Sequence, residues 1–157
     1  VLRLRLLLVK QKISQLLSLQ STISRHTGQR LTSPKVKQLT PDDIATYLGD
    51  PAGQFSSLKN YTLLHQLRRQ IDSIETFVIS RCDPNAKGII IPSTPGIGKI
   101  LGMTILLETG PIERFNKVSN YSFCSRCVPL AKISNGKTKG HGNTKNGNRY
   151  LAMALAA

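Results

Sequence analysis

The chain has 157 residues, of which 39% are hydrophobic and none is tryptophan. Three cysteines at low density argue against a secreted disulfide scaffold, since an odd number cannot pair fully. The apolar runs are far shorter than the roughly 20 residues that cross a bilayer, which excludes a membrane-spanning class. This length predicts one compact domain, or a small domain with an extended arm.

Positive charge is the strongest signal in the composition. Lysine and arginine number 22 against 8 acids, which gives a formal net charge of +14. Residues 1–40 and 114–157 hold eight basic residues each and no acid, whereas all eight acids lie in residues 41–113. Acid-free ends concentrate phosphate around them, so the distribution favours a nucleic-acid partner over a membrane surface.

Two long helices are predicted in the N-terminal half. Residues 2–25 keep apolar side chains at three- and four-residue spacing, with basic residues between them. Residues 57–81 carry a heptad seam made of Leu64, Leu67, Ile71, Ile74 and Val78. We expect the two helices to pack antiparallel as a coiled-coil arm, with their seams buried against each other or against a second copy.

Between the two helices the sequence changes to Gly, Pro, Ser, Thr and Asp. One short helix is predicted there, with Thr40 as its N-cap and Pro41 at its first position. Asp83-Pro84 breaks the second long helix and marks a boundary. The predicted domains are therefore an arm over residues 1–83 and a smaller domain over residues 84–157.

The stretch PGIGK at residues 95–99 is the first that could carry chemistry. A Gly-apolar-Gly turn that opens a helix leaves backbone N–H groups free for phosphate, and Lys99 adds a full charge. Gly110 is placed to cap the end of that helix. The pattern favours a helix-hairpin-helix turn that holds nucleic-acid backbone through Gly96, Gly98 and Lys99, although Pro92 interrupts the preceding helix. The alternative is an ordinary turn before a core helix.

Cys124 and Cys127 have the spacing of half a zinc site, with His141 as the next nitrogen ligand. A closed site needs four ligands, and the sequence has no second pair with suitable spacing. We interpret the two cysteines as small buried thiols and expect no metal here.

Residues 134–149 hold four glycines, four asparagines, three lysines, an arginine and a histidine, without a carboxylate. A loop of this composition can approach phosphates closely, because glycine admits a strand and the cations neutralise its oxygens. Asn135-Gly136 is a turn signal, so Ser134 taken alone is most simply a turn residue. The segment that ends at Asn148 is predicted to start the last helix. The candidate nucleic-acid contacts of this loop are Lys137, Lys139, Lys145, Asn148 and Arg149.

Three stretches together resemble the C-terminal domain of the IS-one-ten transposases, which are also catalogued under IS-one-sixteen and IS-nine-hundred-two. These stretches are PGIGKILGMTILLETGPIERF, RCV at residues 126–128, and SNGKTKGHGNTKNGNRYLAMA. The resemblance covers about residues 88–157, and the arm over residues 1–81 is similar to the coiled-coil linker of the family.

The resemblance implies a DNA recombinase. Its nucleophilic serine, carried over here onto Ser134, attacks a DNA phosphodiester and forms a phosphoserine link. A free hydroxyl on the exchange partner later reverses that link. The family joins this domain to an N-terminal RuvC-like half whose acids bind a divalent metal such as Mg²⁺, and a structured RNA guides some members. We therefore expect DNA as the partner, an additional guide RNA, a homo-oligomer formed through the arm, and a prokaryotic, cytoplasmic protein at the nucleoid.

The sequence as given lacks the RuvC-like half, and its last helix has no stop signal. We therefore expect a truncated transposase that binds nucleic acid, holds no cofactor of its own and is inactive alone. The rival hypothesis is a non-catalytic basic helix-hairpin-helix module that binds DNA or RNA, and a third is a coiled-coil scaffold. The predicted fold is all-α with loops, and short extended pieces are expected at Gly88–Ile91 and Val128–Ile133.

Overall fold

A computed structural model describes residues 1–81, 95–128, 131–141 and 146–156 of the chain. The chain divides into two compact units, an N-terminal unit (Val1–Val78) and a C-terminal unit (Ile79–Ala157). Helices dominate both units, which confirms the predicted all-α class. The C-terminal unit adds a two-stranded antiparallel hairpin.

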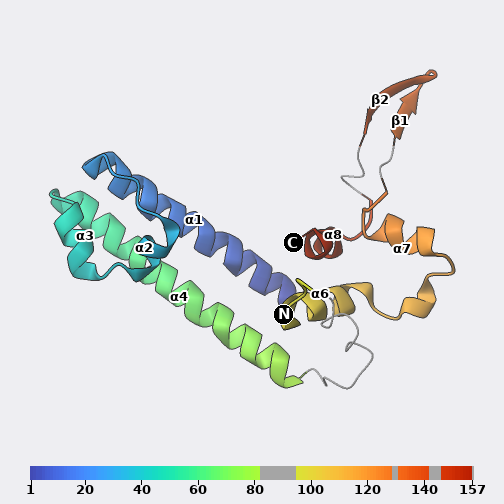
Figure 1. Cartoon of the computed structure of the whole chain (residues 1–157), viewed down its shortest axis with the longest axis horizontal. Helices are drawn as coiled ribbons and strands as arrows, with labels where there is room; N and C mark the ends of the chain where they lie inside the picture. Colours follow the sequence, from blue (N-terminus) through green and yellow to red (C-terminus); the bar gives the residue numbers. More distant parts are fainter. Residues whose placement is uncertain (82–94, 129–130, 142–145, 157) are drawn as a thin grey trace. The chain divides into compact units, whose positions relative to one another are not determined.

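The N-terminal unit is built on α1 (Leu2–Thr27) and α4 (Pro51–Arg81), which run side by side in opposite directions (Figure 1). Near the start of α1, Arg5 Nη2 lies 2.6 Å from Glu75 Oε1 on α4. Further along α1, Asn60 Nδ2 of α4 donates to Ser18 Oγ at 3.3 Å. These two contacts fix an antiparallel register, as the sequence predicted.

The heptad seam of α4 is buried within the chain. Leu67 and Ile71 pack with Leu8 of α1, and Ile74 packs against them. A second cluster joins α1 and α4 to the segment between them and contains Leu16, Leu19, Ile23, Leu31, Val36, Leu39 and Leu64. Fully burying an aliphatic side chain of this size contributes about 1.5–3 kcal/mol. Of the two partners considered for the seam, a second helix or a second copy, the structure shows the helix.

Two short helices cross between α1 and α4. Gly28 ends α1 in the left-handed conformation, with φ 70°. Helix α2 (Ser33–Gln38) was not predicted, although Ser-Pro is a common helix start. Helix α3 (Pro41–Tyr47) begins as predicted. Thr40 Oγ1 accepts from the Asp43 N–H at 3.2 Å, and Asp43 Oδ2 accepts from the Thr40 N–H at 2.8 Å, which together form a capping box.

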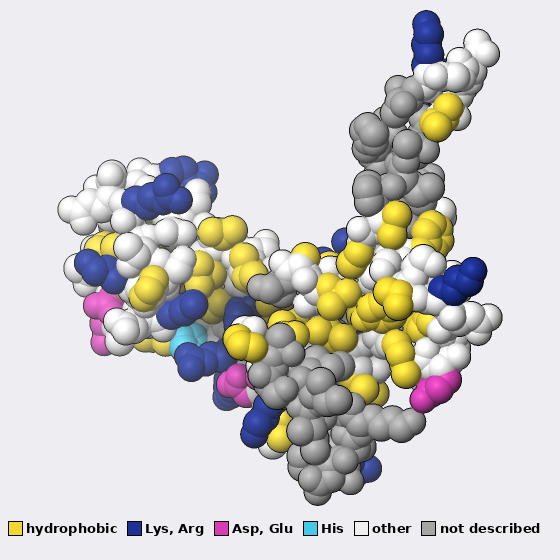
Figure 2. Space-filling view, turned by 45° about the vertical axis from the view of Figure 1, so that its right-hand side comes forward, with side chains coloured by type: hydrophobic (Ala, Val, Ile, Leu, Met, Phe, Trp, Pro, Cys, Tyr) yellow, Lys and Arg dark blue, Asp and Glu magenta, His cyan; other side chains and the backbone are white. Residues whose placement is uncertain are grey.

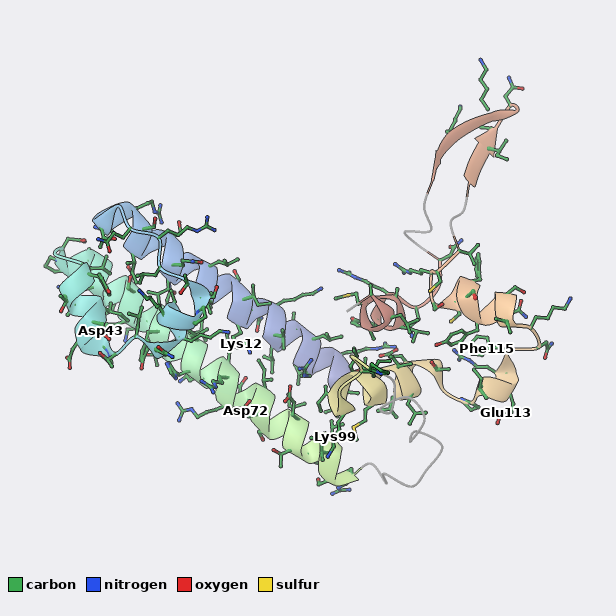
Figure 3. All side chains as sticks on the ribbon, in the orientation of Figure 1. Lys12, Asp43, Asp72, Lys99, Glu113 and Phe115 are labelled. Atoms are coloured by element: carbon green, nitrogen blue, oxygen red, sulfur yellow. The ribbon has the colours of Figure 1, made fainter. Side chains whose placement is uncertain are left out.

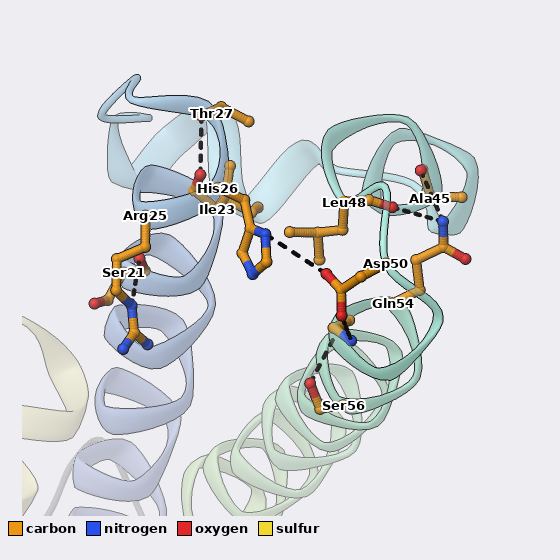
Figure 4. Close-up of polar contacts among 11 residues, drawn as sticks. Ser21, Ile23, Arg25, His26, Thr27, Ala45, Leu48, Asp50, Gln54 and Ser56 are labelled. Carbon is orange, nitrogen blue, oxygen red and sulfur yellow. Dashed lines mark hydrogen bonds and ion pairs between the residues drawn. The ribbon is translucent and has the colours of Figure 1, made fainter.

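The start of α4 is held by polar contacts (Figure 4). Asp50 Oδ2 accepts from the Gly53 N–H at 2.6 Å, and Pro51 occupies the first helical position. Gln54 Nε2 donates to the carbonyl oxygens of Leu48 at 2.6 Å and Ala45 at 3.1 Å. Because of this cap the helix begins at residue 51, six residues earlier than the heptad pattern predicted.

The C-terminal unit contains helices and a hairpin in sequence order. They are α6 (Lys99–Thr109), a 3₁₀ turn η1 (Ile112–Arg114), α7 (Val118–Cys124), β1 (Ala131–Ser134), β2 (Lys137–His141) and α8 (Arg149–Leu155). Ile105 of α6 packs with Leu151 and Ala154 of α8. Gly110 caps α6 as predicted, and its N–H donates to the Leu106 carbonyl.

Several predictions lie outside the described residues. These are the helix break at Asp83-Pro84, the extended piece at Gly88–Ile91, Pro92 and the helix that would precede the PGIGK turn. Within the described residues, α4 extends to Arg81. None of the helices in the described ranges has the length and hydropathy that crossing a bilayer requires.

Candidate nucleic-acid interface

The hairpin forms because its turn residues accept an unusual backbone conformation. Asn135 and Gly136 have φ values of 54° and 71°. Positive φ at both central residues is typical of a type I′ turn, for which Asn-Gly is a preferred pair. The turn therefore brings Ser134 of β1 directly opposite Lys137 of β2.

Ser134 and Lys137 are neighbours across the hairpin and both are exposed. Directly opposed residues of an antiparallel pair project from the same face, with Cβ atoms about 4.5–5.5 Å apart. The turn between them is exposed as well. The Ser134 hydroxyl is thus open to solvent beside a cation, at the tip of a segment, residues 131–141, without a carboxylate in its sequence.

Part of the stretch predicted to be a loop, residues 137–141, forms the strand β2. Its side chains do not alternate between apolar and polar, so the sequence pattern gave no signal for β2. Between the pairs Ile133–Thr138 and Ala131–His141, β1 has one residue, Lys132, and β2 has two, Lys139 and Gly140. This is a β-bulge, which bends a strand and increases its twist. Lys139 is exposed within it.

The predicted PGIGK turn is present, and it opens α6. Gly96 has a φ of 87°, and Gly98 is the N-cap, without a side-chain hydrogen bond to the first turn. Lys99 is the first helical residue, is exposed, and has no acid beside it in that turn. A cation at the positive end of a helix is unfavourable for the helix itself. An anion bound there would interact favourably with both Lys99 and the free N–H groups.

The start of α8 is closed by its own cap. Asn148 Oδ1 accepts from the N–H groups of Tyr150 at 2.9 Å and Leu151 at 3.2 Å. Asn148 Nδ2 donates to Glu108 Oε2 at 2.6 Å, at the far end of α6. The side chain of Asn148 is therefore used in positioning α8 against α6, whereas Arg149 beside it is exposed.

Residues 146–148 are anchored to the end of α7 by contacts that residue spacing does not indicate. Arg126 donates to the Gly147 carbonyl from Nη2 at 3.0 Å and from Nε at 3.3 Å. The Asn148 N–H donates to the Cys124 carbonyl at 2.6 Å. Arg126 belongs to the RCV stretch of the resemblance, which was the available signal for it. No sequence pattern indicated the contact of Glu108 with Asn148.

The predicted site residues lie in three places. The hairpin tip holds Ser134, Lys137 and Lys139, the start of α6 holds Gly96, Gly98 and Lys99, and the start of α8 holds Asn148 and Arg149. Lys99 and Glu108 are nine residues apart on α6, which corresponds to about 14 Å. The α6 and α8 starts are therefore separate contact points. Lys145 lies outside the described residues.

The two cysteines of the CSRC stretch are not both buried, so that interpretation was wrong. Cys124 is half-buried at the end of α7, and Cys127 is exposed. Arg126 has a φ of 59°, a left-handed conformation that ends α7 and precedes the exposed Cys127. In the parts of the chain that the structure describes, no three His, Cys, Asp or Glu side chains gather as metal ligands.

Residues 89–157 match the transposase IS116/IS110/IS902 family, which confirms the resemblance on which the site was predicted. The match indicates a transposase-like kind of protein. No curated protein matches the chain. No solved structure matches it.

Proposed function

We propose that this chain, with its transposase-family residues 89–157, is part of a DNA recombinase that exchanges strands through a phosphoserine link at Ser134. The observation that carries the proposal is the pairing of Ser134 with Lys137 at the exposed tip of the hairpin. A nucleophile that attacks a duplex must reach its phosphates, and a cation beside it stabilises the charge that develops on them.

The proposed reaction is a reversible transfer of a phosphoryl group. Ser134 Oγ bonds to phosphorus while a P–O bond to deoxyribose breaks, the serine proton goes to a base, and the departing alkoxide takes up a proton. A free hydroxyl on the exchange partner then attacks phosphorus and releases the serine. A serine hydroxyl needs activation by a base or metal. We assign that activation to the metal-binding acids of a RuvC-like half, with a divalent ion such as Mg²⁺.

The residues of this chain hold the strand. Lys137 neutralises the phosphate next to Ser134, while Lys139 and Arg149 contact flanking phosphates. At the start of α6, Lys99 and the free N–H groups hold the backbone, where Gly98 lets a strand approach closely. A Cβ added at Gly98 meets no atom within 4 Å. Packing therefore does not require glycine here, and the open backbone leaves room for a strand beside the free N–H groups.

Ser134→Ala tests the chemistry. In a protein that joins this chain to a RuvC-like half, the variant should form no covalent adduct with labelled DNA while binding DNA as before. Thr138→Ala is the matched control. It removes a hydroxyl from the second residue after the turn and should leave the adduct intact. An adduct that survives Ser134→Ala would refute the assignment.

The rival function is a non-catalytic helix-hairpin-helix module, which the uncapped start of α6 favours. It predicts that Ser134→Ala changes nothing, whereas Gly98→Ala weakens DNA binding. A coiled-coil scaffold, in contrast, predicts no affinity for nucleic acid even in dilute salt.

The proposal extends to partners and location. We propose that DNA is the substrate, that a guide RNA joins it, and that the protein works at the prokaryotic nucleoid. A homo-oligomer would form through apolar side chains that α1 leaves exposed, namely Leu4, Leu7, Ile13 and Leu17. Light scattering on the intact chain and on Leu7→Gln distinguishes this from a monomer, since the substitution should shift the mass towards one chain.

A further inference from the structure

The N-terminal unit contains a basic pocket that the proposed function does not use. It has a volume of 230 Å³ and lies where α1, α2 and α4 meet. Its lining consists of Lys12, Leu16, Lys37, Leu64, His65 and Arg68. Three of these side chains are cations from three different helices, and none is an acid. We call this site the arm pocket.

The cations of the arm pocket make no polar contact with another described residue. Within the described ranges, Lys12, Lys37 and Arg68 take part in no hydrogen bond and no ion pair. The acid closest to Arg68 in sequence on α4 is Asp72, and it is not among the residues that line the pocket. Figure 3 labels Lys12 on α1 and Asp72 on α4. The same two long helices do pair charges elsewhere, through Arg5 and Glu75. The arm pocket therefore brings three cations together with no acid among its lining residues.

The floor of the arm pocket is apolar and its rim is charged. Leu16 and Leu64 are buried, whereas Lys37 and Arg68 are exposed and Lys12 is half-buried. His65 is half-buried with its ring 4.3 Å from that of Tyr61. Figure 2 shows Lys and Arg side chains gathered beside a histidine on this unit. Screening extends over about 8 Å at physiological salt, so cations around one small pocket repel each other and attract the same anion.

The chemistry of the lining fits a phosphate group. Arginine presents a fork of donors that matches phosphate oxygens, and lysine supplies mobile point charges. A histidine adds a ring N–H donor. We propose that the arm pocket binds a backbone phosphate of a nucleic-acid strand, as a contact separate from residues 89–157. The contact goes beyond the proposed function, because it needs neither Ser134 nor the hairpin.

The test measures how binding of the full chain depends on salt. The double variant Lys12→Gln/Lys37→Gln is titrated with a labelled DNA duplex and, in a second arm, with a labelled RNA single strand. Loss of one phosphate contact lowers the slope of log K against log salt by about 0.9 for the duplex or about 0.7 for the single strand. A change in the duplex slope alone assigns the phosphate to DNA, and a change in the single-strand slope alone assigns it to RNA.

The matched control is Lys10→Gln/Lys35→Gln. It removes the same charge from two exposed lysines, one on α1 and one on α2, that do not line the pocket. We expect its slope to stay close to that of the parent. Equal slopes for the two double variants, or a Lys12/Lys37 slope unchanged in both arms, would overturn the proposal. Thermal melts check the fold, and the Lys12/Lys37 variant should melt no lower than the parent because repulsion is relieved.

A second measurement reports on the pocket directly. Inorganic phosphate is titrated into the parent while the ring proton signals of His65 are followed by NMR. Saturable shifts that are lost in Lys12→Gln/Lys37→Gln support the site, and shifts that persist in that variant argue against it. Both measurements concern binding alone, so they are unaffected if the reaction proposed for Ser134 fails.

Discussion

At the scale of single residues, Gly147 shows how backbone geometry positions the predicted interface. Its φ is 83°, and an added Cβ would lie 2.5 Å from the Cys124 carbonyl oxygen and 2.8 Å from that of Phe123. Both obstacles are backbone atoms, which cannot rotate away. Glycine is therefore required for the approach of residues 146–148 to the end of α7.

Gly147→Ala should destabilise the C-terminal unit by more than the ~1–3 kcal/mol that a strained backbone conformation costs, since a clash is added. The control is Gly96→Ala, which has a similar φ of 87° but no atom within 4 Å of the added Cβ. Urea unfolding of both variants measures the difference. Equal losses for the two substitutions would show that the close approach is not made.

Thr40 caps α3 through its side chain, and the prediction for it concerns stability. Thr40→Ala removes the acceptor for the Asp43 N–H, and loss of such a cap typically costs about 1 kcal/mol. Thr40→Ser keeps the hydroxyl and should lose only a fraction of this. The free energy of unfolding in urea is the measurement, and an alanine variant as stable as the serine variant would contradict the cap.

The same cap predicts a dependence on pH. Hydrogen bonds from the Thr40 backbone N–H, and then from its hydroxyl, hold the pKa of Asp43 below its ordinary value of 3.8. A lowered folded-state pKa means that the stabilisation is fully present above the unfolded pKa and is lost as the pH falls below it, through the folded pKa. Asp43→Asn should therefore cost stability at neutral pH, and the cost should shrink as the pH falls through the folded pKa of Asp43. The free energy of unfolding is measured against pH for the parent and the variant. A difference between them that does not change with pH would refute this prediction.

At the scale of elements, the seam between α1 and α4 is a buried contact of the N-terminal unit. Ile71 is 3% exposed and packs on Leu8 and Leu67. Ile71→Ala should cost about 2–5 kcal/mol, because it removes buried methyl groups and leaves a cavity. Leu63 of α4 is 39% exposed, so Leu63→Ala should stay within about 0.5 kcal/mol of the parent. Denaturant unfolding compares the two, and similar losses would mean that the seam is not packed as described.

The helices could be predicted from the sequence because their signals are local. Apolar residues at three- and four-residue spacing identified α1, and the heptad seam identified α4. Thr40-Pro41 identified α3, and Gly110 marked the end of α6. The true start of α4 was missed because Asp50-Pro51, a good cap and first residue, lies in a stretch rich in glycine and serine. A helix start is missed when its capping residues lie in a stretch whose composition is typical of a loop.

The candidate site could be predicted only in part. Asn135-Gly136 indicated a turn, but β2 is polar throughout, so no periodicity revealed a strand or the pairing of Ser134 with Lys137. Asn148 was predicted at the start of the last helix, where the structure places it, but no pattern indicated its hydrogen bond to Glu108, 40 residues away in the sequence. Contacts between residues far apart in the sequence, such as the hydrogen bond of Arg126 to Gly147, cannot be predicted from the spacing of residues along the chain.

At the scale of the whole molecule, the division into two compact units predicts how the chain unfolds. Units with separate cores need not unfold together, so calorimetry should resolve two transitions. Ile71→Ala should lower the transition of the N-terminal unit only, and Gly147→Ala that of the C-terminal unit only. One transition that moves with both substitutions would show a single cooperative unit.

The tight turn at the hairpin tip also has a consequence for how strand exchange could be timed. Ser134 and Lys137 are three residues apart, and the conformation of the two residues between them sets their relation. Any swing of the hairpin as a body therefore transports the attacking oxygen together with its counter-charge. In the proposed reaction, one movement of the hairpin therefore brings both Ser134 and the charge of Lys137 to the phosphate. No other helix or strand has to move at the same time.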